Sequence, residues 1–374
     1  MKLAGIRVID LSVFLPGPYL TQALADQGAE VIKIEAPDAG DPARHIGVED
    51  GPSTVFFRNV NRGKKSVVLN LKDARERDEL LALSDSADVF VEAFRPGVVD
   101  RLGVGYETLR ARNPRIVYCS LSAFGQSGPY RDRPAHELAI EALSGALSMT
   151  LGNDGQPAIP GIAIADIVAG LQGLAGVLMA LLRRETTGRG DYLDISLHES
   201  LVAALPNILG PAMAENKQPV VRHERTTGGS AFYQIYATRE GGHIALGGQE
   251  MKFVLTLLEA LGRLDFAPLC ERGPGAHQAP LIEFLRETFL TKTRDEWDVW
   301  LSTLDVCYGA VRTLPEALAD SHLLARGTIV KDALGRRHIA PAIRYREEPA
   351  QPNFNEPGLG EHNSELLGRA AAEV

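Results

Sequence analysis

The chain has 374 residues, a length at which proteins usually form about two or three domains. A net charge of −9 argues against a nucleic-acid-binding protein, which would need clustered positive charge. Three cysteines without a C-x-x-C pair argue against a disulfide framework, and nine histidines without H-E-x-x-H or similar spacing predict no metal site.

The first half of the chain predicts repeated strand–helix units and therefore a parallel sheet. Residues 38–52 are polar and rich in Gly and Pro, which indicates a loop. The turn after the first strand reads Pro16-Gly17-Pro18 and lacks G-x-G-x-x-G, so no dinucleotide site is predicted. We expect strands over residues 6–11, 29–35, 67–71, 88–92, 116–120 and 192–196, and helices over 19–27, 74–85, 106–112 and 198–209.

The second half predicts a smaller α+β domain. Residues 211–227 are polar and uneven in composition, which is typical of a linker. A hairpin is expected over residues 232–238 and 243–247, followed by helices over 250–262, 279–289 and 294–303. From about Leu334 the tail is rich in Pro and Gly and is expected to wrap a surface. We therefore predict an α/β domain over residues 1–210, completed by 330–374, and a linker with a small α+β domain over 211–329.

A lone carboxylate stands at the start of an apolar segment in the middle of the chain. Asp166 is the only charged residue between Ala158 and Leu182, and residues 167–182 predict a buried helix. Asp166 is then either an N-cap, or a catalytic carboxylate beside free helix N–H groups that bind a developing oxyanion. The glycines of this segment and the missing aromatic belt favour a buried helix over a membrane span, and without a secretory leader we expect a cytoplasmic protein.

Basic residues lie at the expected strand exits. Arg95 follows the strand at residues 88–92, at the carboxyl end where open parallel sheets bind ligands, so it is a candidate for a phosphate contact. The cluster NRGKKS at residues 61–66 is either a solvated rim or a second phosphate-binding rim.

Several ordered motifs together resemble the family III CoA-transferases, the group that also contains the α-methylacyl-CoA racemases. The resemblance covers residues 5–327, and implies a large domain with Rossmann-like layers, a small domain and an interlocked homodimer. The motifs are DLS at 10–12, GP at 17–18, LADQGAEVIKIE at 24–35, GDPAR at 40–44, NRGKKS at 61–66, FRPG at 94–97, RLGVGY at 101–106, FGQSGP at 124–129 and TGRG at 187–190.

The resemblance also implies residue roles and an acyl-CoA substrate, with no tightly bound cofactor. Asp166 matches the residue that carries the acyl group in transferases and transfers a proton in racemases. His136 and Glu250 match a histidine and a glutamate that racemases pair, whereas transferases usually have an aromatic residue at the His136 position. The predicted CoA contacts are Phe14, Arg44, Lys72, Ala93, Phe94, Arg95, Arg101 and Leu102.

Three functions remain open at this point. A racemase needs one base on each face of a planar enolate, and His136 and Asp166 come from different segments that can flank a ligand. A CoA-transferase needs only Asp166 as the nucleophile, and a third possibility is an acyl-CoA-binding subunit without catalysis. Racemases commonly read Gly-His-Asp where this chain reads Ala135-His136-Glu137, and the stretch Asp305-Val306-Cys307 is followed by Gly309 and Ala310 in place of the usual Pro-Val. We expect the racemase reaction.

Overall fold

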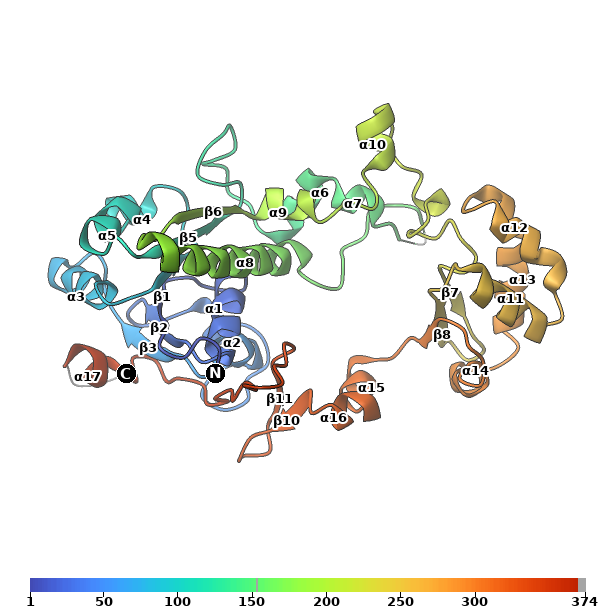
Figure 1. The fold of residues 1–374 in the computed structure, drawn as a ribbon. Helices are drawn as coiled ribbons and strands as arrows, with labels where there is room; N and C mark the ends of the chain where they lie inside the picture. Colours follow the sequence, from blue (N-terminus) through green and yellow to red (C-terminus); the bar gives the residue numbers. More distant parts are fainter. Residues whose placement is uncertain (153, 369–374) are drawn as a thin grey trace. The chain divides into compact units, whose positions relative to one another are not determined.

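A six-stranded sheet organises the first of two units in the computed structural model, which describes residues 1–152 and 154–368 (Figure 1). Of the described residues, this unit comprises 1–146, 160–204 and 321–368. All five strand pairs are parallel, and the order β3-β2-β1-β4-β5-β6 is that of doubly wound Rossmann-type sheets. The predicted α/β class is confirmed. The strands are β1 (Arg7–Asp10), β2 (Glu30–Glu35), β3 (Lys65–Val68), β4 (Val89–Glu92), β5 (Val117–Ser122) and β6 (Tyr192–Ser196).

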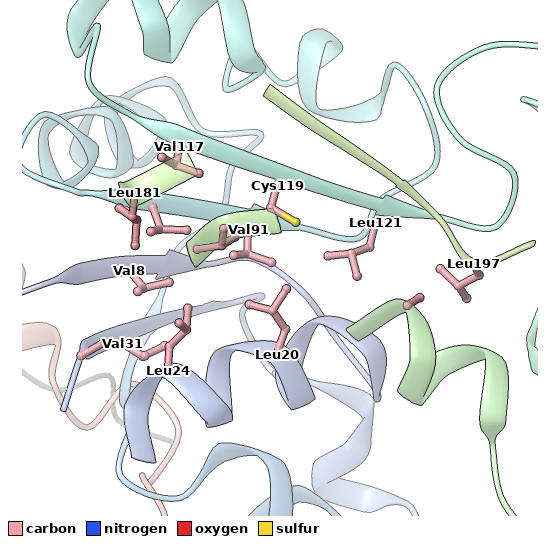
Figure 2. Close-up of a cluster of buried hydrophobic side chains, with 14 of the residues drawn as sticks. Val8, Leu20, Leu24, Val31, Val91, Val117, Cys119, Leu121, Leu181 and Leu197 are labelled. Atoms are coloured by element: carbon pink, nitrogen blue, oxygen red, sulfur yellow. The ribbon is translucent and has the colours of Figure 1, made fainter. Parts of the chain in front are cut away.

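Alternating side chains divide the core of this unit into two layers. Val8, Val91 and Cys119 belong to one buried cluster, whereas their neighbours Ile9 and Phe90 belong to another. Figure 2 shows Leu20 and Leu24 of the helix α1 (Pro16–Asp26) among the side chains of the first cluster. Buried residues on both faces are what a parallel sheet covered by crossover helices requires.

Most longer crossover helices agree with the predicted ranges, whereas several short elements of this unit were not predicted. The helix α2 (Val55–Asn61) begins at Thr54, whose hydroxyl accepts the Phe57 N–H, and the predicted loop contains the 3-10 helix η1 (Pro42–His45). The remaining helices of the unit are α3 (Ala74–Ser84), α4 (Val98–Arg101), α5 (Tyr106–Arg112), α6 (Glu137–Ser144), α8 (Ile164–Thr187), α9 (Leu197–Ala203), α16 (Ser321–Ala325) and α17 (Asn363–Leu367); α7 (Ala146–Met149) follows α6.

The long helix α8 corrects two predictions. It begins at Ile164 after Ala163, so Asp166 lies inside the first turn and is not the N-cap. The helix is buried on one face only, because α1, α9, β5 and β6 cover that face within the chain. The opposite face exposes Leu171, Leu178, Met179 and Leu182. By length and composition α8 is also the one described helix that would suit a membrane span, a test that core helices of soluble proteins pass as well.

The C-terminal tail covers the edge of the sheet, which confirms that it wraps a surface. The Gly63 N–H donates to the Asn355 carbonyl at 2.7 Å, and the Val68 N–H donates to the Asn363 side chain at 2.9 Å. The backbone N–H of His362 also donates to the Ser66 carbonyl. An uncovered edge strand would offer unpaired backbone groups to other chains, so this tail protects β3. A short hairpin, β10 (Ile329–Lys331) with β11 (Arg337–Ile339), precedes this segment.

The second unit comprises residues 147–152, 154–159 and 205–320 and is built on an antiparallel sheet. The predicted hairpin is confirmed as β7 (Gln234–Ala237) and β8 (His243–Leu246), and a third strand, β9 (Tyr308–Ala310), was not predicted. The expected linker contains helix α10 (Gly210–Glu215) and the 3-10 helix η2 (Val221–His223). The other helical elements are α11 (Met251–Ala260), η3 (Leu264–Phe266), α12 (Ala267–Glu271), η4 (Ala276–Gln278), α13 (Ala279–Phe289), α14 (Arg294–Leu301) and α15 (Leu314–Leu318).

Candidate functional site

A cavity of about 250 Å³ lies at the carboxyl ends of the strands, beside the point between β1 and β4 where the strand order reverses. Doubly wound sheets bind their ligands at this point. The loops after β1, β4 and β5 line the cavity together with His136, directly before α6, and Asp166, in the first turn of α8. Six predicted site residues meet here: Phe14, Ala93, Phe94, Arg95, His136 and Asp166.

Asp166 is held beside a second carboxylate, Glu137. The two carboxyl oxygens of Glu137 accept the backbone N–H groups of Ala165 and Asp166, each at 2.8 Å. The N–H groups that we expected to bind an enolate oxygen are therefore already occupied, and this prediction is wrong. Glu137 acts as the missing cap of α8, and its negative charge is stabilised at the positive end of the helix dipole.

Burial and the neighbouring Glu137 carboxylate raise the pKa of Asp166 to about 7. Glu141 lies one turn after Glu137 on α6 and is 1% exposed. Its pKa is likewise raised to about 7, by burial and by the interaction with Glu137. A carboxyl group with a pKa near neutrality can both hold and release a proton at physiological pH, which suits general acid–base catalysis.

His136 is exposed at the start of α6 and lies opposite the loop that follows β1. Its ring and that of Phe14 are edge to face, with their centroids 6.5 Å apart. Phe14 has a φ of 63°, in the left-handed region that side chains rarely adopt. Backbone strain of this kind is common at functional sites, where the surrounding structure maintains it.

A second cavity of about 260 Å³ lies next to the first and shares Val13 and Phe94 with it. The predicted CoA contacts Lys72 and Leu102 line it, with apolar residues from the ends of β1, β2 and β3. The predicted contact Arg101 lies nearby on α4. Its guanidinium and that of Arg131 come within 3.3 and 3.4 Å of where a Cβ on Gly97 would stand. Both guanidinium groups thus lie beside Gly97, which has a φ of 77°.

Two residues that were predicted to belong to this site line neither cavity. Arg44 is buried and donates from Nε and Nη2 to Glu35 at 2.8 and 2.7 Å and from Nη1 to the Pro357 carbonyl at 3.0 Å. This arrangement contradicts a phosphate contact, because the guanidinium already ties β2 to the tail. Glu250 lies at the start of α11 in the second unit, so its pairing with His136 stays a prediction.

Sequence reasoning missed Arg131 and Arg133, which line the first cavity, and two carboxylates next to lining residues, Glu137 and Glu92. Glu137 directly follows His136, and an acidic residue at the start of a helix was the available signal. Arg131 lines the first cavity, and its Nε donates to the Gln126 carbonyl at 3.0 Å. Glu92 ends β4 and accepts the Phe94 N–H at 2.8 Å, and burial raises its pKa to about 7. Within the described ranges no group of three or more His, Cys, Asp or Glu side chains could hold a metal ion.

Comparison with known proteins gives the family. Residues 3–363 match the model of CoA-transferase family III. The human succinyl-CoA:glutarate CoA-transferase is 30% identical over 98% of this chain and 85% of that protein. The human alpha-methylacyl-CoA racemase is 33% identical over 98% of this chain and 93% of that protein. A CAIB/BAIF family protein from Brucella suis has a crystal structure with a TM-score of 0.84 at 29% identity, covering 98% of this chain and 99% of that one.

The chain therefore belongs to CoA-transferase family III, whose members among the similar proteins are named as CoA-transferases or as a racemase. It is an enzyme of this family, and CoA is a substrate component for such enzymes.

Proposed function

We propose that the protein racemises or epimerises a 2-methylacyl-CoA by moving a proton between the two faces of its α-carbon. The observation that carries this proposal is that His136 and Asp166 line one cavity, with the pKa of Asp166 raised to about 7. A transferase needs a carboxylate nucleophile, for which Asp166 alone is enough. Inversion needs two such groups, one to accept a proton and one to donate.

In the proposed reaction one base removes the α-proton, and the C–H bonding pair moves to the thioester as an enolate. The other group, protonated at the start, delivers its proton to the opposite face and is left as the base for the reverse direction. The carboxyl of Asp166 can serve in either state near neutral pH, because burial and Glu137 together oppose its ionisation. Glu137 keeps the carboxyl in place at the first turn of α8 through its two backbone contacts.

CoA transfer is the second candidate, and one feature of the cavity favours it. Arg95, Arg131 and Arg133 also line the cavity, and guanidinium groups bind carboxylates well. In this reaction the Asp166 carboxylate attacks the thioester carbonyl, the C–S bond breaks, and CoA leaves as the thiolate while the acyl group stays on Asp166 as a mixed anhydride. A free carboxylic acid is then required as the acceptor of CoA.

Exchange of the α-proton with solvent separates the two reactions. Incubation with (2R)- or (2S)-2-methylacyl-CoA in D₂O, without any free acid, should place deuterium at Cα and convert each enantiomer into the other. His136→Ala and Asp166→Ala should each abolish inversion, while either variant can retain exchange from a single enantiomer, because the remaining base reaches one face only. Absence of deuterium in the wild type, together with CoA transfer to an added acid that survives His136→Ala, would establish the transferase.

We further propose that the Rossmann-type domain binds CoA and that the protein acts as a homodimer in the cytoplasm. Support for the CoA site comes from Lys72, Arg95 and Arg101, which lie around the two neighbouring cavities. Support for the dimer comes from family membership and from the apolar face of α8, where Leu182 is 75% exposed and Met179 65%. The same proposal includes the interlocking of the two chains and a catalytic role for Glu250.

A further inference from the structure

Five charged side chains are buried below the exits of β1, β2 and β3. Asp10, Lys33, Glu35, Asp41 and Lys64 are each no more than 3% exposed. Lys33 pairs with Asp41 at 2.8 Å and Lys64 with Asp10 at 3.0 Å. Burying charges is costly even when they are paired, and apolar residues would often support the fold as well. This set of charges, here called the buried ion network, therefore calls for an explanation beyond stability.

The buried ion network holds the loop between β1 and α1. Lys33 Nζ donates to the Ser12 carbonyl at 2.8 Å, and the Ser12 N–H donates to Asp10 at 2.9 Å. Two residues later the Phe14 N–H donates to Asp41 Oδ1 at 3.2 Å, and the same oxygen accepts the Ala43 N–H at 2.9 Å. The loop is thus bound on both sides of Val13, and Asp41 is the group that reaches Phe14.

Phe14 needs such support. Of the described non-glycine residues with positive φ, which are Phe14, Asp38, Asn216 and Glu240, it is the one aromatic residue. Asn and Asp tolerate this conformation better than bulky residues do. Because of this φ value the Phe14 ring stands at the cavity wall, edge to face with His136.

We propose that Asp41 is a positioning residue of the active site. Its carboxylate, held by Lys33, keeps Phe14 in the left-handed conformation, and the Phe14 ring in turn fixes the orientation of the His136 imidazole. The link runs Lys33–Asp41–Phe14–His136: Asp41 also lines the second cavity, but it acts on His136 only through Phe14. The catalytic consequence rests on the proposed function, whereas the orientation of His136 does not.

Nuclear magnetic resonance of the histidine rings tests the link without any enzymatic assay. In full-length protein with ¹³C-labelled histidine, His136→Gln identifies the His136 Cε1–H resonance. Glycine can adopt the left-handed conformation of residue 14, so Phe14→Gly removes the aromatic ring without straining the backbone. The change in the His136 chemical shift in this variant shows what loss of the Phe14 ring contact looks like. Asp41→Asn retains an oxygen for the Phe14 N–H but loses the ion pair, and should move the His136 resonance in the same direction.

The control is Asp26→Asn, which breaks a different ion pair of the same unit, between Asp26 and Arg62 at 2.9 Å. It should leave the His136 resonance unchanged. A wild-type His136 resonance in folded Asp41→Asn overturns the proposal. If Asp41→Asn does not fold, the Phe14→Gly spectrum still decides, because an unmoved His136 resonance there means that Phe14 does not set its orientation.

Racemase activity then measures the effect of this link on catalysis. Asp41→Asn and Phe14→Gly should each lower kcat about tenfold, and Phe14→Gly should also raise KM because Phe14 is a predicted CoA contact in the cavity. The double variant should lose no more kcat than either single variant, since both changes act on His136 through one contact. Independent losses that multiply would show that Asp41 acts by another route and would overturn the proposal. If the wild type lacks racemase activity, the proposed function fails while the resonance test still reports on the positioning link.

Discussion

At the scale of single residues, the acid–base properties of the site depend on how its carboxyl groups are arranged. Glu137 occupies the N–H groups of Ala165 and Asp166. Burial, together with the charge of Glu137, raises the pKa of Asp166 to about 7. An isolated carboxylate on a helix end would instead be fully ionised at neutral pH. The local contact thus converts an ordinary Asp into a group that can donate as well as accept a proton.

Asp166 should reduce stability at neutral pH, as functional groups held in strained electrostatic surroundings do. Its pKa is raised from 3.8 to about 7, so between these values the folded chain keeps a proton that the unfolded chain releases. The free energy of unfolding of the wild type therefore falls as pH rises across this window, by roughly 2 to 4 kcal/mol. Asp166→Asn should escape this loss. Urea unfolding at about pH 5 and about pH 8 measures it, and parallel curves for the two proteins would contradict it.

Arg95 and Arg101 should contribute to CoA affinity, and Arg44 should not do so directly. Loss of a charge-assisted contact to phosphate costs about 1.5 to 3 kcal/mol, so Arg95→Ala and Arg101→Ala should each raise the dissociation constant of CoA roughly 10- to 100-fold. Titration calorimetry provides the measurement. Thr108→Ala, on α5 away from both cavities, is the control, and unchanged affinity in both arginine variants would exclude this site.

At the scale of elements, glycines set how closely α8 approaches α1 and the sheet. A Cβ on Gly170 would stand 2.8 Å from the Pro16 carbonyl oxygen, which is backbone. A Cβ on Gly173 would stand 2.6 Å from Leu20 Cδ1, the end of a flexible side chain. Pro16 begins α1 and also lines the catalytic cavity, so the packing of α8 bears on the site.

Gly170→Ala should therefore destabilise the protein more than Gly173→Ala. Both changes gain about 1 kcal/mol of helix propensity, while overpacking costs about 1 to 3 kcal/mol. The Pro16 backbone yields less easily than the Leu20 side chain, so we expect a net loss of about 1 to 2 kcal/mol for Gly170→Ala and a value near zero for Gly173→Ala. Denaturant unfolding measures both, and equal losses would show that the two contacts relax alike.

At the scale of the whole molecule, α8 presents an apolar face that the described chain leaves uncovered. Leu171, Leu178, Met179 and Leu182 recur at helical spacing, as expected for a face that packs on another structure. Such a face on a core helix of the Rossmann-type unit is consistent with the homodimer that we propose. Exposed apolar surface of this extent otherwise favours aggregation.

Charge on this face should weaken the dimer. Met179→Lys and Leu182→Lys together place two cations in an apolar contact, and desolvating each costs several kcal/mol. Sedimentation should show a dimer for the wild type at all concentrations, and a monomer or an unfolded chain for the double variant. Leu334→Lys, another exposed leucine, is the matched control and should stay dimeric. A dimer that withstands the double change would place the interface elsewhere.

The sequence by itself determined the sheet, its parallel direction and most helices. Alternating apolar strands separated by amphipathic helices allow few other arrangements, because parallel strands need crossovers that pack on both faces. It also singled out His136 and Asp166, since an ordered set of motifs fixes positions along the chain. The short helix α2 and the strand β9 escaped, because elements this short are stabilised by tertiary contacts more than by local pattern.

Only the tertiary structure decided what surrounds those positions. Glu137 reaches Asp166 across 29 residues of chain, and Arg44 meets Pro357 across 313, so neither partner is visible in local sequence. The first contact removed a predicted oxyanion site and raised a pKa; the second removed a predicted phosphate contact. The free energies of hydrogen bonding and charge burial depend on which atoms meet, and chain folding alone brings those atoms together.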